Sequence, residues 1–388
     1  MTKTESIVGL YDRHVMPTYS RSLTLVKGQG SWVWDAEGKK YLDFLAGIAV
    51  VSVGHCNPEV TAAIREQAGQ LVHVSNLYYT ENQGRLAEML ARVSMGGKCF
   101  FCNSGAEANE AQIKLARLWG HDRGKFEVIT MKNSFHGRTL ATAAATGQAK
   151  IQKGFEPMPE GFRYAEFNNL ESVRSLLTDR TAAVLVEAVQ GEGGILPAKP
   201  EFMKGLRALC DEVQCGLCRT GHWFAFQAYG IQPDAFSLAK GLGNGYPIGA
   251  MVTSPKMANV FQPGHHASTF GGTPLACAAA LATLRVMEKN KLDAHAVKMG
   301  QRLRTGLAAF QAKVPRIKEV RGMGLMLGMA LDRPAKPLVD RMLGMGLIAL
   351  ATAESVVRFL PPLTIDEAEV DAALGIVERA LAAWQDTV

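Results

Sequence analysis

The stretch Ala235-Phe-Ser-Leu-Ala-Lys-Gly-Leu-Gly-Asn-Gly-Tyr-Pro-Ile-Gly-Ala250 joins a short apolar run to a glycine-rich turn, and Lys240 stands at the junction. An apolar run of this length that ends in glycines is typical of a strand buried in a parallel sheet. A lysine at the end of such a strand can face a pocket, where desolvation turns its amine into a nucleophile. The pattern also fits an ordinary surface lysine at a turn, so these residues alone leave both interpretations open.

Similar apolar runs alternate with helical segments on the N-terminal side of this stretch. The alternation is typical of an α/β fold with a mainly parallel sheet that is flanked by helices. We expect residues 59–273 to form this large domain. Residues 1–58, an arm with a hairpin, and residues 274–388, an α+β segment, are expected to form a smaller domain together. The predicted strands of the large domain are 99–102, 127–131, 183–189 and 235–239.

The composition argues against several classes of protein. The net charge of +6 comes from 42 basic and 36 acidic residues without a long basic run, so nucleic acid is not an expected partner. No apolar run approaches the roughly 18 residues of a membrane helix, and the N-terminus lacks a secretory signal, so we expect a cytoplasmic protein. The two Cys-x-x-Cys pairs, 99–102 and 215–218, lie farther apart than the roughly 15–20 residues of a zinc framework, so no metal is expected.

One interior strand of the sheet is predicted to be missing near residue 212. A helix is expected from Glu201 to about Glu212, and the chain then runs directly into a turn that contains glycine. A buried strand requires about five apolar residues, and this segment offers no such run. Each buried backbone group left without a partner would cost about 1–3 kcal/mol. Either residues 207–210 leave the helix and fill the sheet, or the fold is damaged at this point.

The segment Asn103-Ser-Gly-Ala-Glu-Ala-Asn109 follows one predicted strand and begins a helix. The first N–H groups of a helix have no partner within it, and the helix dipole is positive there. Gly105 would let a ligand approach the main chain closely, so the segment could bind a phosphate. A helix start capped by Ser104 or Asn103 is the simpler explanation of these residues alone.

Two further strand ends carry polar and aromatic residues. In Ser134-Phe-His-Gly-Arg138, Phe135 could stack on a flat ring and Arg138 could bind a carboxylate with two parallel hydrogen bonds. Glu187 and Glu192 follow the next strand, where ordinary ion pairing would explain them equally well.

Together, these segments resemble the class III aminotransferases, which depend on pyridoxal phosphate and have fold type I. The resemblance runs in order along nearly the whole chain. The matching stretches are residues 23–28, 54–58, 104–109, 134–139, 211–214, 219–221, 238–243 and 268–272.

The resemblance implies that pyridoxal phosphate is the cofactor and that Lys240 binds it covalently and then moves a proton between substrate and cofactor. Ser104, Gly105 and Ala106 would bind its phosphate. The partner subunit's Thr269 would reach the same phosphate, so the resemblance also implies a homodimer with shared sites.

Three more residues would contact the cofactor ring. Phe135 would lie on the pyridine ring, and Gln214 would lie near the phenolic oxygen. Asp211 would pair with the ring nitrogen and keep it protonated, which lets the ring accept electrons. Since the strand that supports Asp211 is predicted to be missing, its carboxylate could fail to reach the ring.

The resemblance also implies a set of substrate-binding residues. Arg138 would bind the carboxylate distant from the reacting amine, and Ser268 would contact the substrate beside it. Glu192 would mask Arg358 by an ion pair while a terminal amine is bound, and would release it for the second carboxylate of 2-oxoglutarate.

The implied reaction transfers the terminal amine of N2-acetylornithine to 2-oxoglutarate, giving N-acetylglutamate semialdehyde and glutamate for arginine biosynthesis. The motifs specify the cofactor better than the amino donor, so succinylornithine, succinyldiaminopimelate and 4-aminobutyrate are alternative donors. A third hypothesis is a non-catalytic homologue that is impaired by the missing strand.

Overall fold

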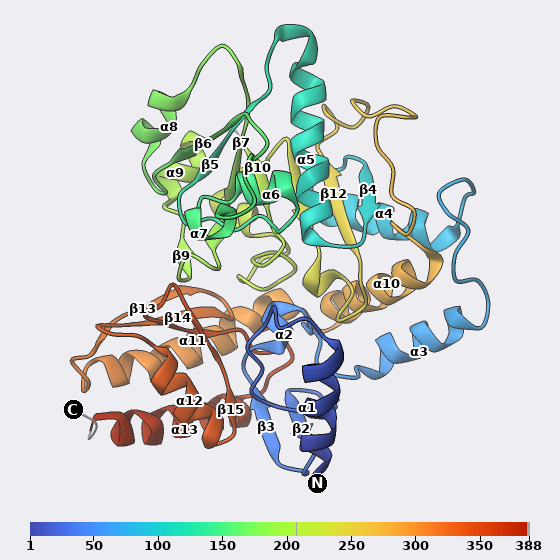
Figure 1. Cartoon of the computed structure of the whole chain (residues 1–388). Helices are drawn as coiled ribbons and strands as arrows, with labels where there is room; N and C mark the ends of the chain where they lie inside the picture. The colour runs from blue at the N-terminus through green and yellow to red at the C-terminus, as the bar shows by residue number, and fades with distance from the viewer. Residues whose placement is uncertain (207, 386–388) are drawn as a thin grey trace.

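A seven-stranded sheet forms the centre of the larger part of the molecule (Figure 1). The computed structural model, which describes residues 1–206 and 208–385, orders the strands β4-β12-β11-β10-β7-β5-β6. β12 runs antiparallel to both of its neighbours, and the other pairs are parallel. This confirms the predicted α/β fold with a mainly parallel sheet. The strands are β4 (Cys99–Cys102), β5 (Glu127–Met131), β6 (Phe162–Ala165), β7 (Thr181–Glu187), β10 (Leu209–Asp211), β11 (Ala235–Leu238) and β12 (Gly249–Thr253).

Helix α5 (Gly105–Gly120) packs against β7, β11 and β12 and buries an alanine-rich face there. It begins where Ser104 Oγ accepts the N–H of Glu107 at 3.2 Å, which satisfies one of the free amides of the first turn. The other helices of this part are α3 (Pro58–Ala68), α4 (Glu81–Val93), α6 (Leu140–Ala145), α7 (Ala149–Gln152), α8 (Leu170–Leu176), α9 (Pro200–Gly205) and α10 (Pro274–Lys289), with the 3-10 helices η1 (His121–Arg123), η2 (Ala225–Tyr229) and η3 (Lys240–Leu242).

Strand β10 corrects the prediction of a missing strand. The helix expected to reach Glu212 is α9, which ends at Gly205. Leu209–Asp211 then lie between β7 and β11 and pair in parallel with both. The main chain adds two hydrogen bonds beyond the strand, from Asp234 N to Ala208 O and from Glu212 N to Ser237 O. The sheet is therefore continuous, and the first of the two alternatives holds. Arg207, the first residue of the predicted refill, lies outside the described residues.

A second part of the molecule combines the two ends of the chain (Figure 1). The N-terminal hairpin β2–β3 forms as predicted, and β3 pairs in parallel with β15 from the C-terminal region. The domain boundaries after residues 58 and 273 stay a prediction. We call the part around the seven-stranded sheet, with the helices given above, the large domain, and the part described here the small domain. The strands of the small domain are β1 (Leu25–Gln29), β2 (Trp32–Asp35), β3 (Lys40–Asp43), β13 (Ile317–Met323), β14 (Met326–Leu331), β15 (Leu347–Ile348), β16 (Leu350–Thr352) and β17 (Val356–Phe359). Its helices are α1 (Lys3–His14), α2 (Ala46–Ala49), α11 (Leu292–Gln311), α12 (Lys336–Gly344) and α13 (Glu367–Gln385).

A short antiparallel hairpin, β8 (Val189–Gln190) and β9 (Leu196–Pro197), extends from the large domain toward β13 (Figure 1). Its turn, residues 191–195, carries Glu192. The hairpin therefore brings one of the predicted site residues to the junction of the two domains.

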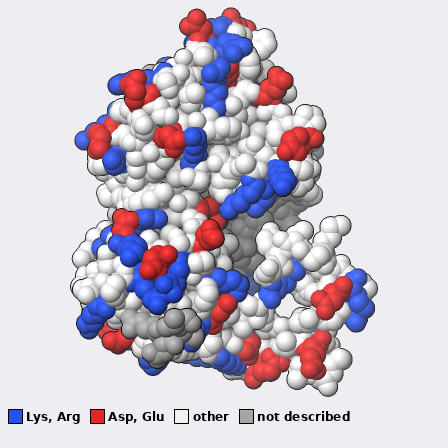
Figure 2. Space-filling model, turned by 60° about the vertical axis from the view of Figure 1, so that its left-hand side comes forward, with Lys and Arg blue, Asp and Glu red and all other residues white. Residues whose placement is uncertain are grey.

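The surface carries charges of both signs. Figure 2 shows basic and acidic side chains interspersed over the face in view. Among the described residues, no helix is long and apolar enough to cross a membrane.

The short strand generates a first prediction, which concerns Leu209. Leu209 is 4% exposed and belongs to one buried apolar cluster with Ile113, Leu115 and Leu185. Leu209→Ala should lower the free energy of unfolding by about 2–4 kcal/mol. Because Asp211 is only two residues farther along the same strand, the substitution should also weaken cofactor binding. Guanidinium unfolding and titration with pyridoxal phosphate measure the two effects.

Leu307→Ala is the matched control. Leu307 is fully buried on α11 in the small domain. This variant should lose similar stability and keep the cofactor affinity of the unchanged protein. Equal cofactor affinity in the two variants would contradict the role given to β10.

Candidate active site

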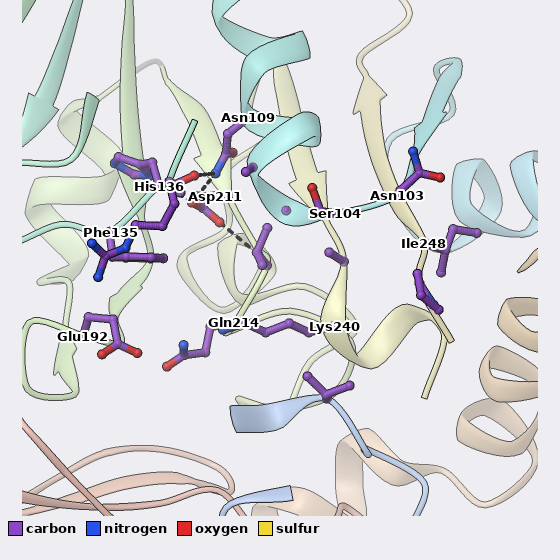
Figure 3. A pocket seen from close by; sticks show the side chains of 18 of the residues that line it. Asn103, Ser104, Asn109, Phe135, His136, Glu192, Asp211, Gln214, Lys240 and Ile248 are labelled. Atoms are coloured by element: carbon purple, nitrogen blue, oxygen red, sulfur yellow. Dashed lines mark hydrogen bonds and ion pairs between the residues drawn. The ribbon is translucent and has the colours of Figure 1, made fainter. Parts of the chain in front are cut away.

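A cavity of about 390 Å³ lies at the carboxyl ends of β7, β10 and β11 (Figure 3). Ligands of open α/β sheets bind at this edge, because loops and helix starts converge there. The cavity brings together most of the predicted site residues, which come from segments far apart in the sequence. Those that line it are Ser104, Gly105, Ala106, Phe135, Arg138, Glu192, Asp211, Gln214 and Lys240.

Lys240 lies just beyond the end of β11, as the first residue of η3. Its backbone φ of 45° is in the left-handed region, which is costly for a residue with a side chain and is frequent at active sites. Burial lowers the pKa of its amine to about 8, and the positive charge of Arg358 acts in the same direction. Glu192 and Asp211 oppose this shift. Lys240 is therefore not the exposed surface lysine of the alternative interpretation.

Asp211 ends β10 and points into the cavity between two polar partners (Figure 3). Its Oδ2 accepts a hydrogen bond from Asn109 Nδ2 at 2.8 Å. The same oxygen lies 2.8 Å from His136 Nδ1. Its Oδ1 accepts the N–H of Val213 at 3.0 Å. The sequence left open whether Asp211 would miss the cofactor ring, and in the structure β10 holds this residue at the carboxyl edge of the sheet.

His136 and Asn109 are site residues that the sequence analysis did not single out. Both are buried and line the cavity. Asn109 is in turn oriented by Ser237, whose Oγ donates to Asn109 Oδ1 at 2.7 Å. Both lie inside segments that the analysis quoted, but a single sequence contains no signal that joins them to Asp211, which is 102 residues after Asn109.

The start of α5 forms another wall of the cavity. Gly105 and Ala106 occupy its first turn, where backbone N–H groups lack helical acceptors. A Cβ at Gly105 would lie 2.7 Å from Cγ1 of Val213, so only glycine fits between this turn and the segment after β10. The result is an open, electropositive helix start that suits an anion.

Phe135 and Arg138 lie in the segment after β5 and line the cavity together. The Arg138 guanidinium lies 5.6 Å from the centre of the Phe135 ring. The N–H of Phe135 donates to Glu187 Oε2 at 3.1 Å. Burial, and then the neighbouring Asp211 carboxylate, raise the pKa of Glu187 well above its usual value.

Arg358, on β17, reaches the cavity from the small domain without lining it. Its side chain is fully buried, and its Nη1 binds Glu192 Oε1 at 2.6 Å and Gln214 Oε1 at 3.1 Å. Burial raises the pKa of Glu192, but the charge of Arg358 and its hydrogen bond outweigh this and lower the pKa overall. Nε and Nη2 of Arg358 are buried and have no partner among the described residues. The predicted pair of Glu192 and Arg358 therefore exists, with Gln214 as a third member.

Ser268 and Thr269 do not line this cavity. They lie on a neighbouring hollow, and Thr269 is exposed. Ser268 Oγ accepts a hydrogen bond from Asn103 Nδ2 at 3.3 Å, which is the link between this segment and the cavity wall. One chain by itself therefore leaves Thr269 outside the cavity that contains Lys240.

Comparisons with known proteins agree with this geometry. The sequence profile "Aminotransferase class-III" matches residues 15–381. The chain belongs to the class III aminotransferase family. Its recognition from the sequence is thus confirmed, as are the aminotransferase reaction and the cofactor, pyridoxal phosphate.

Curated relatives are similar to this class III aminotransferase over nearly their whole length. The acetylornithine aminotransferase of Caldanaerobacter subterraneus subsp. tengcongensis is 47% identical over 383 residues, covering 95% of this chain and 97% of the relative. The enzyme of the same name from Methanocaldococcus jannaschii is 46% identical over 390 residues, covering 97% and 98%.

Solved structures extend the comparison to the fold. The ornithine aminotransferase of Toxoplasma gondii superposes with a TM-score of 0.96 at 32% identity, covering 100% of this chain and 97% of that one. The N-acetylornithine aminotransferase of Stenotrophomonas maltophilia gives 0.85 at 36% identity, covering 98% and 100%. The predicted fold type I is confirmed by these neighbours.

The groups in the cavity fit pyridoxal phosphate chemically. A buried carboxylate suits a protonated ring nitrogen, an open helix start suits a phosphate, and an amine of low pKa suits an aldehyde. Among the described residues, no group of three or more His, Cys, Asp and Glu side chains is placed to hold a metal ion.

A second prediction follows from the pKa of Lys240. The folded pKa of about 8 is below the usual 10.5, so the unfolded chain binds more protons between these values. The free energy of unfolding of the cofactor-free protein should therefore gain a contribution as pH rises from 8 to 10.5. Lys240→Met removes this titration and should be more stable than the unchanged protein at pH 7, by on the order of 2 kcal/mol.

Guanidinium unfolding of both cofactor-free proteins at pH 7, 8, 9 and 10 measures this difference. The advantage of Lys240→Met should shrink as pH rises, while titrations elsewhere cancel in the comparison. A difference that stays constant over this range would show that Lys240 is not desolvated.

Proposed function

We propose that this class III aminotransferase transfers the terminal amine of N2-acetylornithine to 2-oxoglutarate, giving N-acetylglutamate semialdehyde and glutamate. The observation that carries the chemistry is the placement of the half-buried Lys240 in one cavity with Asp211 and the start of α5, and its lowered amine pKa agrees with it. The choice of donor rests on full-length relatives that carry the name acetylornithine aminotransferase. An arginine-biosynthetic role and a cytoplasmic location accompany this assignment as predictions.

Pyridoxal phosphate, when bound, supplies an aldehyde for the amine and a ring that accepts electrons from the reacting carbon. Lys240 Nζ would hold this aldehyde, because its lowered pKa leaves a useful fraction of neutral amine near pH 8. Once free, the same Nζ would take the proton from the reacting carbon of the donor and deliver it to the aldehyde carbon of the cofactor.

The cavity walls hold the cofactor in place for this transfer. Asp211 keeps a proton on the ring nitrogen, and His136 and Asn109 keep the Asp211 carboxylate in position. Phe135 would cover the ring, and Gln214 would contact the phenolic oxygen. These assignments use side chains that the fold already places around one cavity.

The phosphate would be bound by the start of α5, with Ser104, Gly105 and Ala106, and by the partner subunit's Thr269. Thr269 is exposed, and the adjacent Phe270 side chain is 60% exposed, as expected for a segment that a second copy covers. We therefore assign a homodimer whose two sites are each completed by the other chain.

Arg138 and Arg358 divide the recognition of carboxylates between them. Arg138 lines the cavity and would bind the carboxylate of the donor that is distant from the reacting amine. The charge of Arg358 is neutralised by Glu192 at Nη1, so a second carboxylate gains little there while that ion pair persists. Turning Glu192 away exposes a fully buried guanidinium, which the second carboxylate of 2-oxoglutarate can neutralise.

The non-catalytic alternative loses its support. It depended on an absent strand, and β10 pairs with both neighbours and places Asp211 in the cavity. The other donors, succinylornithine, succinyldiaminopimelate and 4-aminobutyrate, have no specific observation in their favour and serve as competitors in the assay.

A third prediction tests the function directly. The purified holoenzyme should show the absorbance band of lysine-bound cofactor near the edge of the visible range, and Lys240→Ala should lack it. Acetylornithine should change this spectrum, and its kcat/KM with 2-oxoglutarate should exceed that of each competing donor.

The outcomes separate the parts of the proposal. A higher kcat/KM with another donor would replace acetylornithine and keep the reaction, whereas a spectrum inert to every ω-amine would contradict an active aminotransferase. Sedimentation of the same preparation should find a dimer, and an active monomer would exclude a shared site.

A fourth prediction concerns Glu192. Glu192→Ala leaves Arg358 charged and unpaired, so amines with a carboxylate on the same carbon should bind better than before. The ratio of kcat/KM for acetylornithine over glutamate as amino donor should fall by about tenfold or more, since a buried ion pair is worth several kcal/mol once one partner is removed.

Glu171→Ala is the control for this measurement. Glu171 forms an exposed ion pair on α8 and does not line the cavity. This variant should keep the ratio of the unchanged enzyme. A Glu192→Ala enzyme with an unaltered ratio would remove the gate from the proposed function.

A further inference from the structure

The turn that carries Glu192, residues 191–195, is held by the small domain. Thr352 Oγ1, at the end of β16, donates to the main-chain oxygen of Glu192 at 2.9 Å. Arg321, on β13, donates from Nε and Nη2 to the oxygen of Gly194 at 2.9 and 2.8 Å. Both residues bind main-chain oxygens, one of Glu192 itself and one two residues later, and they leave the Glu192 carboxylate free for Arg358.

Ile195 fixes the end of the same turn by packing. It is fully buried, and its φ of 55° is a strained value for a β-branched residue. It lies against Gly322 and Gly328 of the small domain, where an added Cβ would come within 3.0 Å of Ile195 atoms. A strained conformation persists only where the surroundings determine it, so this contact is a tight one.

The large domain holds the other end of the turn. The N–H of Gly191 donates to Glu187 Oε1 at 3.2 Å, and Gln190 Nε2 donates to Lys132 O at 2.9 Å. A Cβ at Gly191 would collide with the Gln214 amide, so the main chain is closely packed here as well. The side chain of Glu192 is 32% exposed, whereas its partner Arg358 is fully buried. The side chain of Glu192 is thus the part of this turn with room to move.

We infer that Thr352 and Arg321 are positioning residues that fix the main chain beneath Glu192, so that the choice between substrates depends on rotation of the Glu192 side chain alone. This inference rests on the proposed gate between Glu192 and Arg358. It adds that the small domain, which also supplies Arg358 from β17, holds both partners of the ion pair at a fixed separation.

The direction of the effect follows from competition. A dicarboxylate must displace Glu192 from Arg358, whereas a monocarboxylate that binds at Arg138 does not. If the turn is loosened, the ion pair loses part of the preorganisation that stabilises it, and the ligand's second carboxylate displaces Glu192 more easily. Binding of dicarboxylates should therefore tighten when the anchor is removed, while binding of monocarboxylates stays unchanged.

The test uses the holoenzyme with glutarate and valerate as competitive inhibitors, since they have the same chain length and differ by one carboxylate. Thr352→Val removes the hydroxyl at nearly constant volume, and Arg321→Met removes the guanidinium but keeps a long side chain. In each variant, the inhibition constant for glutarate should fall by about three- to tenfold, the range expected for losing one hydrogen bond in Thr352→Val and a shared pair of them in Arg321→Met. The inhibition constant for valerate should stay within about twofold of the unchanged enzyme, because valerate has no second carboxylate to compete with Glu192.

Thr352→Ser is the matched control. It keeps the hydroxyl, so its inhibition constant for glutarate should equal that of the unchanged enzyme. Arg358→Ala separates the inference from the gate on which it rests. If Arg358→Ala leaves the preference for glutarate over valerate intact, the gate itself is wrong. If Arg358→Ala abolishes that preference while Thr352→Val and Arg321→Met both keep it at the original value, the gate stands and the positioning role is overturned.

Discussion

The position of the Asp211 carboxylate is the constraint on which the rest of this site depends. Asp211 lies opposite Glu187 in the pairing of β10 with β7, so two buried acids are neighbours. Such an arrangement is unfavourable unless hydrogen bonds satisfy the charged group and the other acid stays neutral. His136, Asn109 and the Val213 amide satisfy Asp211, and the pKa of Glu187 is raised by burial and by Asp211. The sheet, helix α5 and the segment after β5 therefore all contribute to holding one negative charge at the bottom of the cavity.

The strands with continuous apolar runs could be predicted from the sequence, and β10 could not. β4, β5 and β11 each contain four or five residues of consistent pattern and lie between turn signals, so periodicity identifies them. β10 has three residues, and they continue a segment whose composition favours helix. Hydrogen bonds to β7 on one side and to β11 on the other decide its conformation, and such long-range pairing overrides local propensity.

The candidate site was predictable to the extent that its residues follow strand ends. Lys240, Phe135 and the start of α5 lie at one edge of the sheet for a topological reason that the sequence reveals. Arg358 and Thr269 carry no local signal, and their expected roles came from the family resemblance. Thr352 and Arg321 were not expected at all. They bind main-chain oxygens 160 and 127 residues away in sequence, and every residue has a main-chain oxygen, so the sequence contains no signal for these contacts.

The charges around Lys240 connect the ion pair of Glu192 with the chemistry at the amine. Burial and the guanidinium of Arg358 lower the pKa of Lys240, and Glu192 partly offsets them. If Glu192 turned away without a replacement, Lys240 would face an uncompensated positive charge, and its pKa would fall further. A ligand carboxylate that takes the place of Glu192 on Arg358 restores the negative charge. An exchange of one carboxylate for another therefore keeps the proton affinity of Lys240 nearly the same in both half-reactions, whereas a loosely held Glu192 would let it vary. A turn held rigidly by the small domain thus serves the amine as well as the choice of substrate, because it confines the change in charge to the moment when a second carboxylate arrives.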